Sequence, residues 1–268
     1  MSSVDTRQRQ RGVFGSVLPT PAMDAAVLGD LLARDKRRSQ PAVVVPAADR
    51  EMSYHDFITT AYKSGNVLRY LGLSADARLA VDPALRPEPL LAFLGAAQLG
   101  AVTTFDSTAE ARVRLVSVDD EAAHTERGGR LAVFGGSPEA TTTTHWEQEV
   151  WSENPAFPPT EVDPESTALV AGDQQYSHRR LLKMAERVVE ELSLTKGSRL
   201  AIRTPLSRPE TIGGGLVAAL AAGATAVFIT DAATAVDADA ALVDDAALVD
   251  DEQSTPEPRR LAIGTLLD

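Results

Sequence analysis

The feature that most constrains the fold of this 268-residue chain is an internal repeat. Short apolar runs, a segment containing serine, histidine and tyrosine, and a glycine-alanine pair occur in the same order in both halves. The offset between them is nearly constant, which indicates two copies of one supersecondary unit. The matched segments are 42–45 with 168–171, 53–55 with 176–178, 79–81 with 200–202, and 100–101 with 223–224.

Each copy has the pattern of a β-α-β-α-β unit. In the first copy, Ser53 precedes the acidic Asp56, and apolar residues then recur every three or four positions until Gly72, which predicts a helix. Proline at position 87 opens a second helical pattern. We expect strands at 42–45, 50–53, 78–81 and 101–105, helices at 53–72 and 87–99, and a further amphipathic helix at 23–38.

Units of this kind place their strands in parallel, because each crossover helix returns the chain to the same end of the sheet. The sequence therefore predicts an α/β fold of two similar β-α-β-α-β lobes, with mostly parallel sheets flanked by helices. The expected organisation is a disordered tail at 1–22, a first lobe with its connecting segment at 23–160, a second lobe at 161–231, and an acidic tail rich in alanine and aspartate at 232–268.

The connecting segment and the acidic tail contain further patterns. The connecting segment contains strand-like runs at 113–118 and 130–134, and prolines near its end indicate an extended linker. The acidic tail contains the sequence Ala-Leu-Val-Asp-Asp twice, which we interpret as a fraying helix.

The charge of the chain limits its partners. It has 38 acidic and 26 basic residues and a formal net charge of −12, which disfavours binding to nucleic acid or to an anionic membrane. Lysine occurs only four times while aspartate is abundant, a composition typical of adaptation to high salt. An acidic protein from a GC-rich genome is the alternative explanation.

The chain has no cysteine, which excludes disulfides, a thiolate nucleophile and a sulfur-ligated zinc site. Residues 1–11 are polar with no apolar run behind them, so they do not resemble a signal peptide. Glycines at 213–215 and 223 interrupt the longest apolar stretch, 212–230, which we therefore assign to a soluble core. A cytoplasmic location is expected.

Several motifs carry a family resemblance through their order. They are Met52-Ser-Tyr-His-Asp-Phe57, Asn66-Val-Leu-Arg-Tyr-Leu-Gly72 and Arg78-Leu-Ala-Val81 in the first half, and Tyr176-Ser-His-Arg-Arg-Leu-Leu182, Leu206-Ser-Arg-Pro209 and the glycine-led segment 213–225 in the second. Together they cover roughly residues 25 to 231 and resemble the amino-terminal domain of the AMP-binding (adenylate-forming) acyl-CoA synthetase family.

The resemblance implies a lost phosphate site. In that family a loop rich in glycine, serine and threonine, closed by proline, lysine and glycine, precedes the serine-histidine helix and wraps the ATP phosphates. Phosphate binding needs close backbone N–H groups, hydroxyls and a cation. Residues 171–175, Ala-Gly-Asp-Gln-Gln, occupy this place with one glycine, no hydroxyl, no lysine and the negative charge of Asp173. The chain therefore resembles a truncated, degenerate relative.

The resemblance assigns no catalytic residue. The sequence ends before the family's adenine-binding segment with its magnesium-coordinating glutamate, before its ribose-binding aspartate, and before its carboxy-terminal domain with the catalytic lysine. The ligand-binding candidates are Ser177, His178, Gly213, Gly214 and Gly215, although Ser177 also fits a helix N-cap and the glycines also fit close helix packing. The four histidines lack metal-ligand spacing, so no metal site is expected.

Three functional hypotheses follow. The first is a non-catalytic binding or regulatory homologue without cofactor, whose partner is a protein, a second copy of the chain, or an acyl or CoA-type small molecule. The second is one part of a split acyl-CoA ligase that adenylates a carboxylic acid with a partner chain, using ATP and magnesium. The third is a structural subunit that docks through an apolar face of the second lobe.

Overall fold

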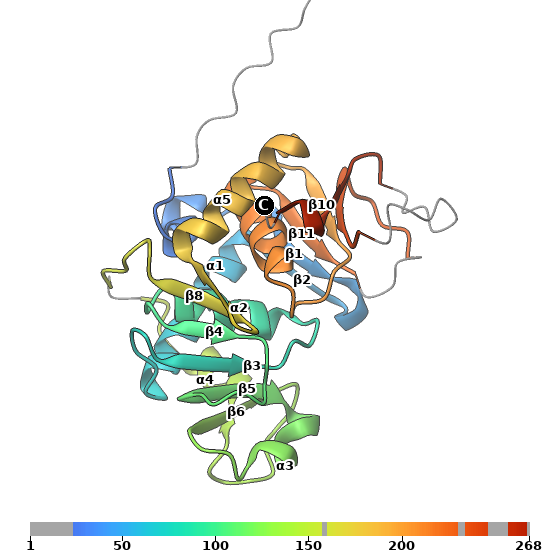
Figure 1. The fold of residues 1–268 in the computed structure, drawn as a ribbon. Helices are drawn as coiled ribbons and strands as arrows, with labels where there is room; N and C mark the ends of the chain where they lie inside the picture. Colours follow the sequence, from blue (N-terminus) through green and yellow to red (C-terminus); the bar gives the residue numbers. More distant parts are fainter. Residues whose placement is uncertain (1–23, 157–159, 230–233, 246–256, 267–268) are drawn as a thin grey trace, which may run out of the picture.

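The computed structural model describes residues 24–156, 160–229, 234–245 and 257–266. Two mostly parallel sheets are flanked by helices, which confirms the predicted α/β class (Figure 1). The strand order is β13-β12-β10-β11-β1-β2 in the six-stranded sheet, here sheet A, and β7-β6-β5-β3-β4-β8-β9 in the seven-stranded sheet, here sheet B. The predicted tail at 1–22 lies outside the described residues.

The strands agree closely with the repeat. Sheet A contains β1 (Pro41–Val45), β2 (Arg50–Ser53), β10 (Arg199–Ile202), β11 (Thr225–Phe228), β12 (Ala240–Val243) and β13 (Arg260–Ala262). Sheet B contains β3 (Arg78–Val81), β4 (Val102–Thr104), β5 (Val113–Ser117), β6 (Arg130–Phe134), β7 (Thr144–His145), β8 (Thr167–Ala171) and β9 (Gln174–Ser177).

The helices connect these strands. The α-helices are α1 (Tyr54–Tyr70), α2 (Pro87–Ala97), α3 (Glu121–His124), α4 (Trp146–Ser152), α5 (His178–Glu191) and α6 (Ala218–Ala222). A π-helix, η5 (Thr211–Val217), runs directly into α6. Short 3₁₀ turns are η1 (Leu28–Leu32), η2 (Arg34–Lys36), η3 (Pro46–Ala48), η4 (Val118–Asp120) and η7 (Ile263–Leu266).

The two copies of the repeat exchange their first hairpins. The β1–β2 hairpin of the first copy joins sheet A, where Val43 of β1 pairs in parallel with Ala226 of β11. The β8–β9 hairpin of the second copy joins sheet B, where Leu169 of β8 pairs with Thr103 of β4. Each sheet therefore contains strands from both halves, and the predicted division into consecutive lobes at 160/161 does not describe how the strands assemble.

The two hairpins are built alike. Each has a register shift at the same place, between Pro41 and Val43 in one and between Thr167 and Leu169 in the other. Each leads into a helix capped by serine, since the Ser53 hydroxyl accepts a hydrogen bond from the Asp56 amide at 3.1 Å and the Ser177 hydroxyl accepts one from the Arg180 amide at 3.1 Å. This geometry satisfies one exposed amide at each helix start.

The residue after each capping serine connects the two halves. The buried Tyr54 hydroxyl donates to the carbonyl of Ala224 at 2.7 Å, and the buried His178 accepts from the amide of Leu28 at 3.2 Å. Each side chain thus reaches backbone that belongs to the other copy. These two bonds lie beside the exchanged strand pairs and reinforce them.

Two sequence expectations were wrong. The described part of 23–38 forms the two separate turns η1 and η2, not one helix, because Ala33 between them is extended with φ −54° and ψ 143°. Leucines spaced three and four apart fit a 3₁₀ turn as well as a helix. Within 232–268, the described residues form β12 and β13. All four residues of β12 and the last two of β13 are buried, which suits short parallel strands.

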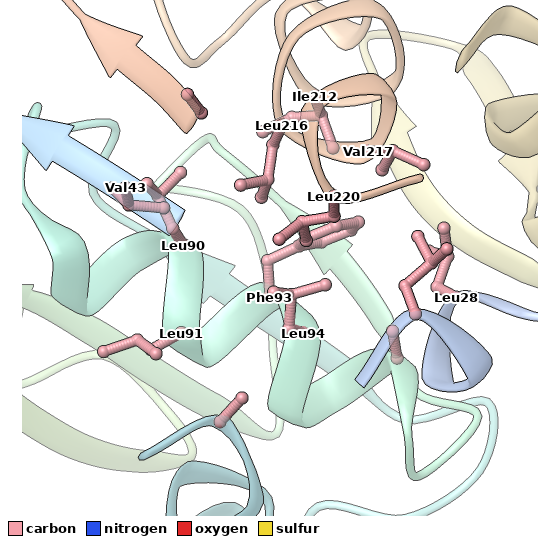
Figure 2. Packing of buried hydrophobic residues seen from close by; sticks show 14 of the residues in the cluster. Leu28, Val43, Leu90, Leu91, Phe93, Leu94, Ile212, Leu216, Val217 and Leu220 are labelled. Atoms are coloured by element: carbon pink, nitrogen blue, oxygen red, sulfur yellow. The ribbon is translucent and has the colours of Figure 1, made fainter. Parts of the chain in front are cut away.

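The core between the sheets is built from helices of both copies. Leu90, Phe93 and Leu94 of α2 lie against Ile212, Leu216 and Leu220 of η5 and α6 (Figure 2). The α1–α2 contact is equally close, because a Cβ on Gly95 would lie 2.7 Å from the backbone nitrogen of Gly65. The two backbones therefore meet with no side chain between them.

Residues 234–238 cover part of the outer face of sheet A. Ala201, Val227 and Ala241 form a small buried cluster there, with Val236 packed against it. The large hydrophobic side chains that are exposed in the described part of the chain, Tyr70 and Trp151, lie on α1 and α4. No described helix has the length and apolarity needed to span a lipid bilayer.

Replacing Gly95 with alanine tests the helix contact. The added methyl group has to push α1 and α2 apart, because its contacts are backbone atoms, and should lower the free energy of unfolding by about 1–3 kcal/mol. Gly29→Ala is the matched control, since a Cβ there would meet only the Gln98 side chain at 3.6 Å. Urea denaturation followed by circular dichroism measures both, and a Gly95→Ala variant as stable as the control would contradict the close contact.

Candidate functional site

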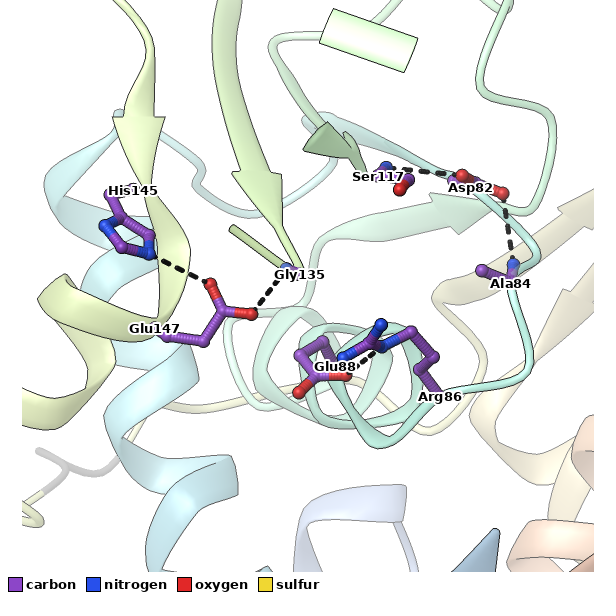
Figure 3. Close-up of polar contacts among 8 residues, drawn as sticks. All are labelled: Asp82, Ala84, Arg86, Glu88, Ser117, Gly135, His145 and Glu147. Carbon is purple, nitrogen blue, oxygen red and sulfur yellow. Dashed lines mark hydrogen bonds and ion pairs between the residues drawn. The ribbon is translucent and has the colours of Figure 1, made fainter. Parts of the chain in front are cut away.

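The carboxyl end of sheet B is the edge where topology predicts a ligand site. The chain leaves β3 to one side through β4 and returns on the other side through β5, and open α/β sheets bind ligands outside the carboxyl ends of strands at such a reversal. Asp82 follows β3, Ser117 ends β5 and Gly135 follows β6, so all three lie at this edge (Figure 3).

Asp82 joins two of these strands. One carboxylate oxygen accepts from the amide of Ala84 at 3.1 Å, and the other accepts from the amide of Ser117 at 3.3 Å. Both oxygens are thus engaged by backbone donors from the β3 and β5 ends. This arrangement fixes the spacing of the strand ends and leaves Asp82 poorly placed to act as a general base.

Glu147 at the start of α4 faces the same edge. Its Oε1 accepts from the amide of Gly135 at 2.6 Å, and its Oε2 lies 3.5 Å from Nε2 of His145. Oε2 is buried without a hydrogen bond within the described structure, so a protonated His145 would supply its missing partner. The pair can therefore hold a proton between an imidazole and a carboxylate.

Arg86 and Glu88 complete the cluster from the start of α2. The Arg86 Nε lies 3.4 Å from a carboxylate oxygen of Glu88, whose side chain is only 7% exposed. The same guanidinium group lies 5.9 Å from the ring centre of Phe134. The Arg86 side chain is partly exposed and carries a positive charge that can meet an anionic ligand at this edge.

The chemistry available at this edge is binding and proton exchange. Within the described ranges, no three histidine, aspartate or glutamate side chains come together to hold a metal ion. The sequence analysis did not select Asp82, Arg86, Glu88 or Glu147. For Asp82, Arg86 and Glu88 the usable signal was their position, because Asp82 directly follows a predicted strand and the other two lie at the start of a predicted helix. No predicted element indicated Glu147.

The hairpin turn at 171–174 lies where the family resemblance places a phosphate loop. Ala171 pairs directly with Gln174, which leaves Gly172 and Asp173 as a two-residue turn between β8 and β9. Gly172 has φ +56°, and nothing lies within 4 Å of a Cβ built on it. The turn is tight and exposed, and it has no run of free amides that converge on one point.

The structure places Ser177 and His178 in structural roles. Ser177 is the N-cap of α5, as described above. His178 has 0% exposed surface, and Nδ1 accepts the Leu28 amide, which places the ring proton on Nε2. Burial lowers the pKa of His178 to about 4, against a smaller opposing effect of Asp30, so the ring is neutral at pH 7.

The three glycines Gly213, Gly214 and Gly215 are buried in η5. A Cβ on Gly213 would lie 2.6 Å from Sδ of Met184, one on Gly214 would lie 2.7 Å from Leu266, and one on Gly215 would lie 3.0 Å from Ile202. The glycines thus allow η5 to pack closely against α5 and sheet A. The nearest contacts of a Cβ at each of them are apolar side chains, and those of Gly213 belong to α5, the helix that His178 begins.

A buried ion pair closes the carboxyl end of sheet A. Arg203 follows β10, and its Nη2 lies 2.6 Å from Oε1 of Glu257, with the two side chains 3% and 0% exposed. Arg203 also donates to the carbonyl of Thr234 at 2.9 Å. In sheet A the chain reverses direction between β10 and β12, as it does between β3 and β5 in sheet B. The side chains of Arg203 and Glu257 therefore occupy this point.

Comparisons with known proteins agree with this architecture. No family model matches the sequence, and no curated protein is detectably similar to it. The structure has the fold of the amino-terminal domain of CoA ligases and acyl-CoA synthetases, as the motif order predicted. At 15–18% identity, this likeness establishes the fold and not the activity.

Three solved structures illustrate the likeness. An anthranilate CoA ligase in complex with anthranoyl-AMP is 18% identical with a TM-score of 0.71, and the match covers 81% of this chain and 49% of that one. A fatty acyl CoA synthetase from Mycobacterium tuberculosis is 17% identical with a TM-score of 0.69, covering 87% and 51%. The N-terminal domain of FACL13 from the same organism is 17% identical with a TM-score of 0.67, covering 83% and 64%. The match thus spans from about half to under two thirds of these proteins.

His178 should make the protein sensitive to acid. Because its pKa is about 4 in the folded state and about 6.5 when unfolded, the unfolded chain binds more protons between these values. Stability is complete above about pH 6.5 and falls as the pH drops toward 4, by up to about 3 kcal/mol from this group. His178→Asn keeps an acceptor for Leu28 and should flatten this dependence. The measurement is urea denaturation across pH 4 to 7.

The control for this prediction is His55→Asn, which changes an exposed histidine at the start of α1. It should retain the pH dependence of the unmodified protein. An equally steep loss of stability in His178→Asn would contradict the assignment of the acid sensitivity to His178.

Removing one partner of the buried pair should be costly. Glu257→Ala leaves Arg203 buried without its carboxylate and should lower the free energy of unfolding by about 3–5 kcal/mol. The double variant Arg203→Met, Glu257→Leu should recover much of this loss, because it leaves no buried charge. Arg187→Ala, which breaks an exposed pair with Glu191, should cost less than about 1 kcal/mol. A Glu257→Ala variant no worse than Arg187→Ala would refute the role of the pair.

Proposed function

We propose that this protein is a non-catalytic homologue of the acyl-CoA ligase amino-terminal domain that acts in binding or regulation. The observation that carries the proposal is the β8–β9 turn. A triphosphate grip requires several amides that point at one anion, and preferably a cation beside them. Between the paired Ala171 and Gln174 only two residues remain, and one of them is the acidic Asp173.

The first copy of the repeat supports this interpretation. There β1 and β2 are joined by the short turn around η3, from Val45 to Arg50. The second copy has an even shorter connection at the equivalent position. The β8–β9 hairpin is therefore a complete structural unit of the repeat, with strand pairing up to the turn, and it contains no insertion that would wrap a nucleotide.

The remaining groups fit a binding role better than adenylation. Adenylation has to neutralise developing phosphate charge, which requires positioned cations. His178 at the start of α5 is buried and neutral, and its Nδ1 already accepts a hydrogen bond from the Leu28 amide. The partner classes we propose are a protein, a second copy of the chain, or an acyl or CoA-type small molecule.

Turnover provides the direct test. The purified protein with magnesium ATP and a panel of carboxylic acids should release no pyrophosphate above the rate without protein, measured in a coupled assay beside an active acyl-CoA ligase. Acid-dependent pyrophosphate release by the chain alone would overturn the proposal. Release that appears only after addition of a co-purifying partner would favour the split-ligase alternative, in which another chain supplies the phosphate-binding groups.

A further inference from the structure

A basic cleft lies at the amino ends of the strands of sheet B, opposite the carboxyl ends where Asp82, Arg86 and Glu147 lie. Its volume is about 810 Å³, and four arginines line it: Arg78, Arg112, Arg114 and Arg127. They come from the starts of β3 and β5 and from the loop that precedes β6. We refer to it as the arginine cleft.

This concentration of positive charge is unusual in a protein with a net charge of −12. Within the part of the chain that the structure describes, ion pairs form elsewhere, yet no carboxylate oxygen lies within 4.0 Å of any of these four guanidinium groups. Asp76 and Glu110 also line the cleft but do not pair with the arginines at that distance. The charge is therefore left for a ligand or solvent.

Backbone carbonyls hold three of the four arginines in place. Nη1 of Arg114 donates to the carbonyls of Ser107 and of Ala109, the latter at 2.9 Å, and Nη1 of Arg127 donates to Thr108 at 3.1 Å. Nε of Arg112 donates to Gly72 at 3.3 Å. Arg114 is buried, and none of its guanidinium nitrogens is buried without a partner in the described structure. The other three arginines are exposed and line the cleft.

Arg114 is a buried cation beside another positive charge. The residue is only 3% exposed, and burial followed by the charge of Arg127 lowers its pKa, while Asp106 partly opposes this effect. His124, buried nearby, has its pKa lowered by burial and by the same two arginines, against smaller effects of Asp120 and Asp82. Repulsion among fixed cations would be relieved by a bound anion.

The other copy of the repeat shows that the fold does not need arginine at the positions of Arg112 and Arg114. By register, Arg78 corresponds to Arg199, Arg112 to Asp239 and Arg114 to Ala241. In sheet A, the Asp239 carboxylate accepts from the Arg199 amide at 2.8 Å. Arg199 thus remains basic in sheet A, while aspartate and alanine stand there in place of Arg112 and Arg114.

We propose that the arginine cleft binds a small molecule that carries a diphosphate group. Guanidinium groups match phosphate oxygens with paired hydrogen bonds, and several of them at fixed positions suit two linked phosphates. The volume lies within the range of small-molecule sites. Asp76 and Glu110 at its lining disfavour a long polyanion such as nucleic acid. The inference does not depend on the function proposed above, since this edge is distant in the fold from the β8–β9 turn.

The test is calorimetric titration of the full-length protein with sodium pyrophosphate at fixed ionic strength. We expect saturable binding to one site, weakened at least tenfold in Arg78→Gln and in Arg127→Gln, because a hydrogen bond between charged groups is worth about 1.5–3 kcal/mol. Both side chains are exposed, and Arg78 makes no side-chain hydrogen bond in the described structure, so these variants should fold. Urea denaturation of each variant verifies that they do.

Two controls make the result decisive. Arg50→Gln removes the same charge from an exposed position on β2 of sheet A and should bind pyrophosphate as the unmodified protein does. Citrate at equal ionic strength should bind at least tenfold more weakly than pyrophosphate. Absence of saturable binding, equal loss in Arg50→Gln, unchanged binding in both cleft variants, or citrate binding as tight as pyrophosphate would each overturn the proposal.

Discussion

The exchange of hairpins between the two copies of the repeat is the interaction on which the rest of the structure depends. Parallel pairing of β1 with β11, and of β8 with β4, places a strand from each half inside the sheet of the other. The adjacent bonds of Tyr54 and His178 cross the same boundary. Neither sheet is complete with residues of one half alone, so the chain is one folding unit although its sequence is duplicated.

The two copies of the repeat share their strand arrangement but differ in the side chains at the strand ends. Equivalent positions hold arginine and aspartate, or arginine and alanine, while the strands around them keep the same register. At the carboxyl edges the difference is similar, since sheet A is closed by the Arg203–Glu257 pair while sheet B has Arg86 and the His145–Glu147 pair facing outward. The two sheets thus share their strand order and register but differ in the charge of the side chains at the strand ends.

Local sequence signals predicted the regular elements well. Capping serines at 53 and 177, glycine after α1 and the apolar periods define helices and strands close to those observed. They did not predict the exchange, because an apolar run such as 41–45 indicates a buried strand but not its partner. The same limit explains β12 and β13, whose short apolar runs acquire strand geometry only by pairing with β10 and with each other.

The candidate site residues were harder to predict for a related reason. Ser177, His178 and the glycines of η5 were selected by motif, and the structure places them in capping and packing roles. The arginine cleft is assembled from three segments that approach one another only because of the strand order. In sheet B, β5 lies between β3, which contains Arg78, and β6, which Arg127 precedes. No linear motif joins them, so their proximity becomes visible only once the register of β3, β5 and β6 is known.

The exchange also has a consequence for synthesis of the chain on the ribosome. When β1 and β2 emerge, the parallel neighbour of β1, Thr225–Phe228, has not yet been made. The edge of this hairpin remains unpaired while well over a hundred further residues are translated, and such long-range parallel contacts form slowly. An open strand edge is a site for wrong pairing with other chains. The hairpin is therefore exposed to misassembly until β11 has been made, and sheet A cannot close before then.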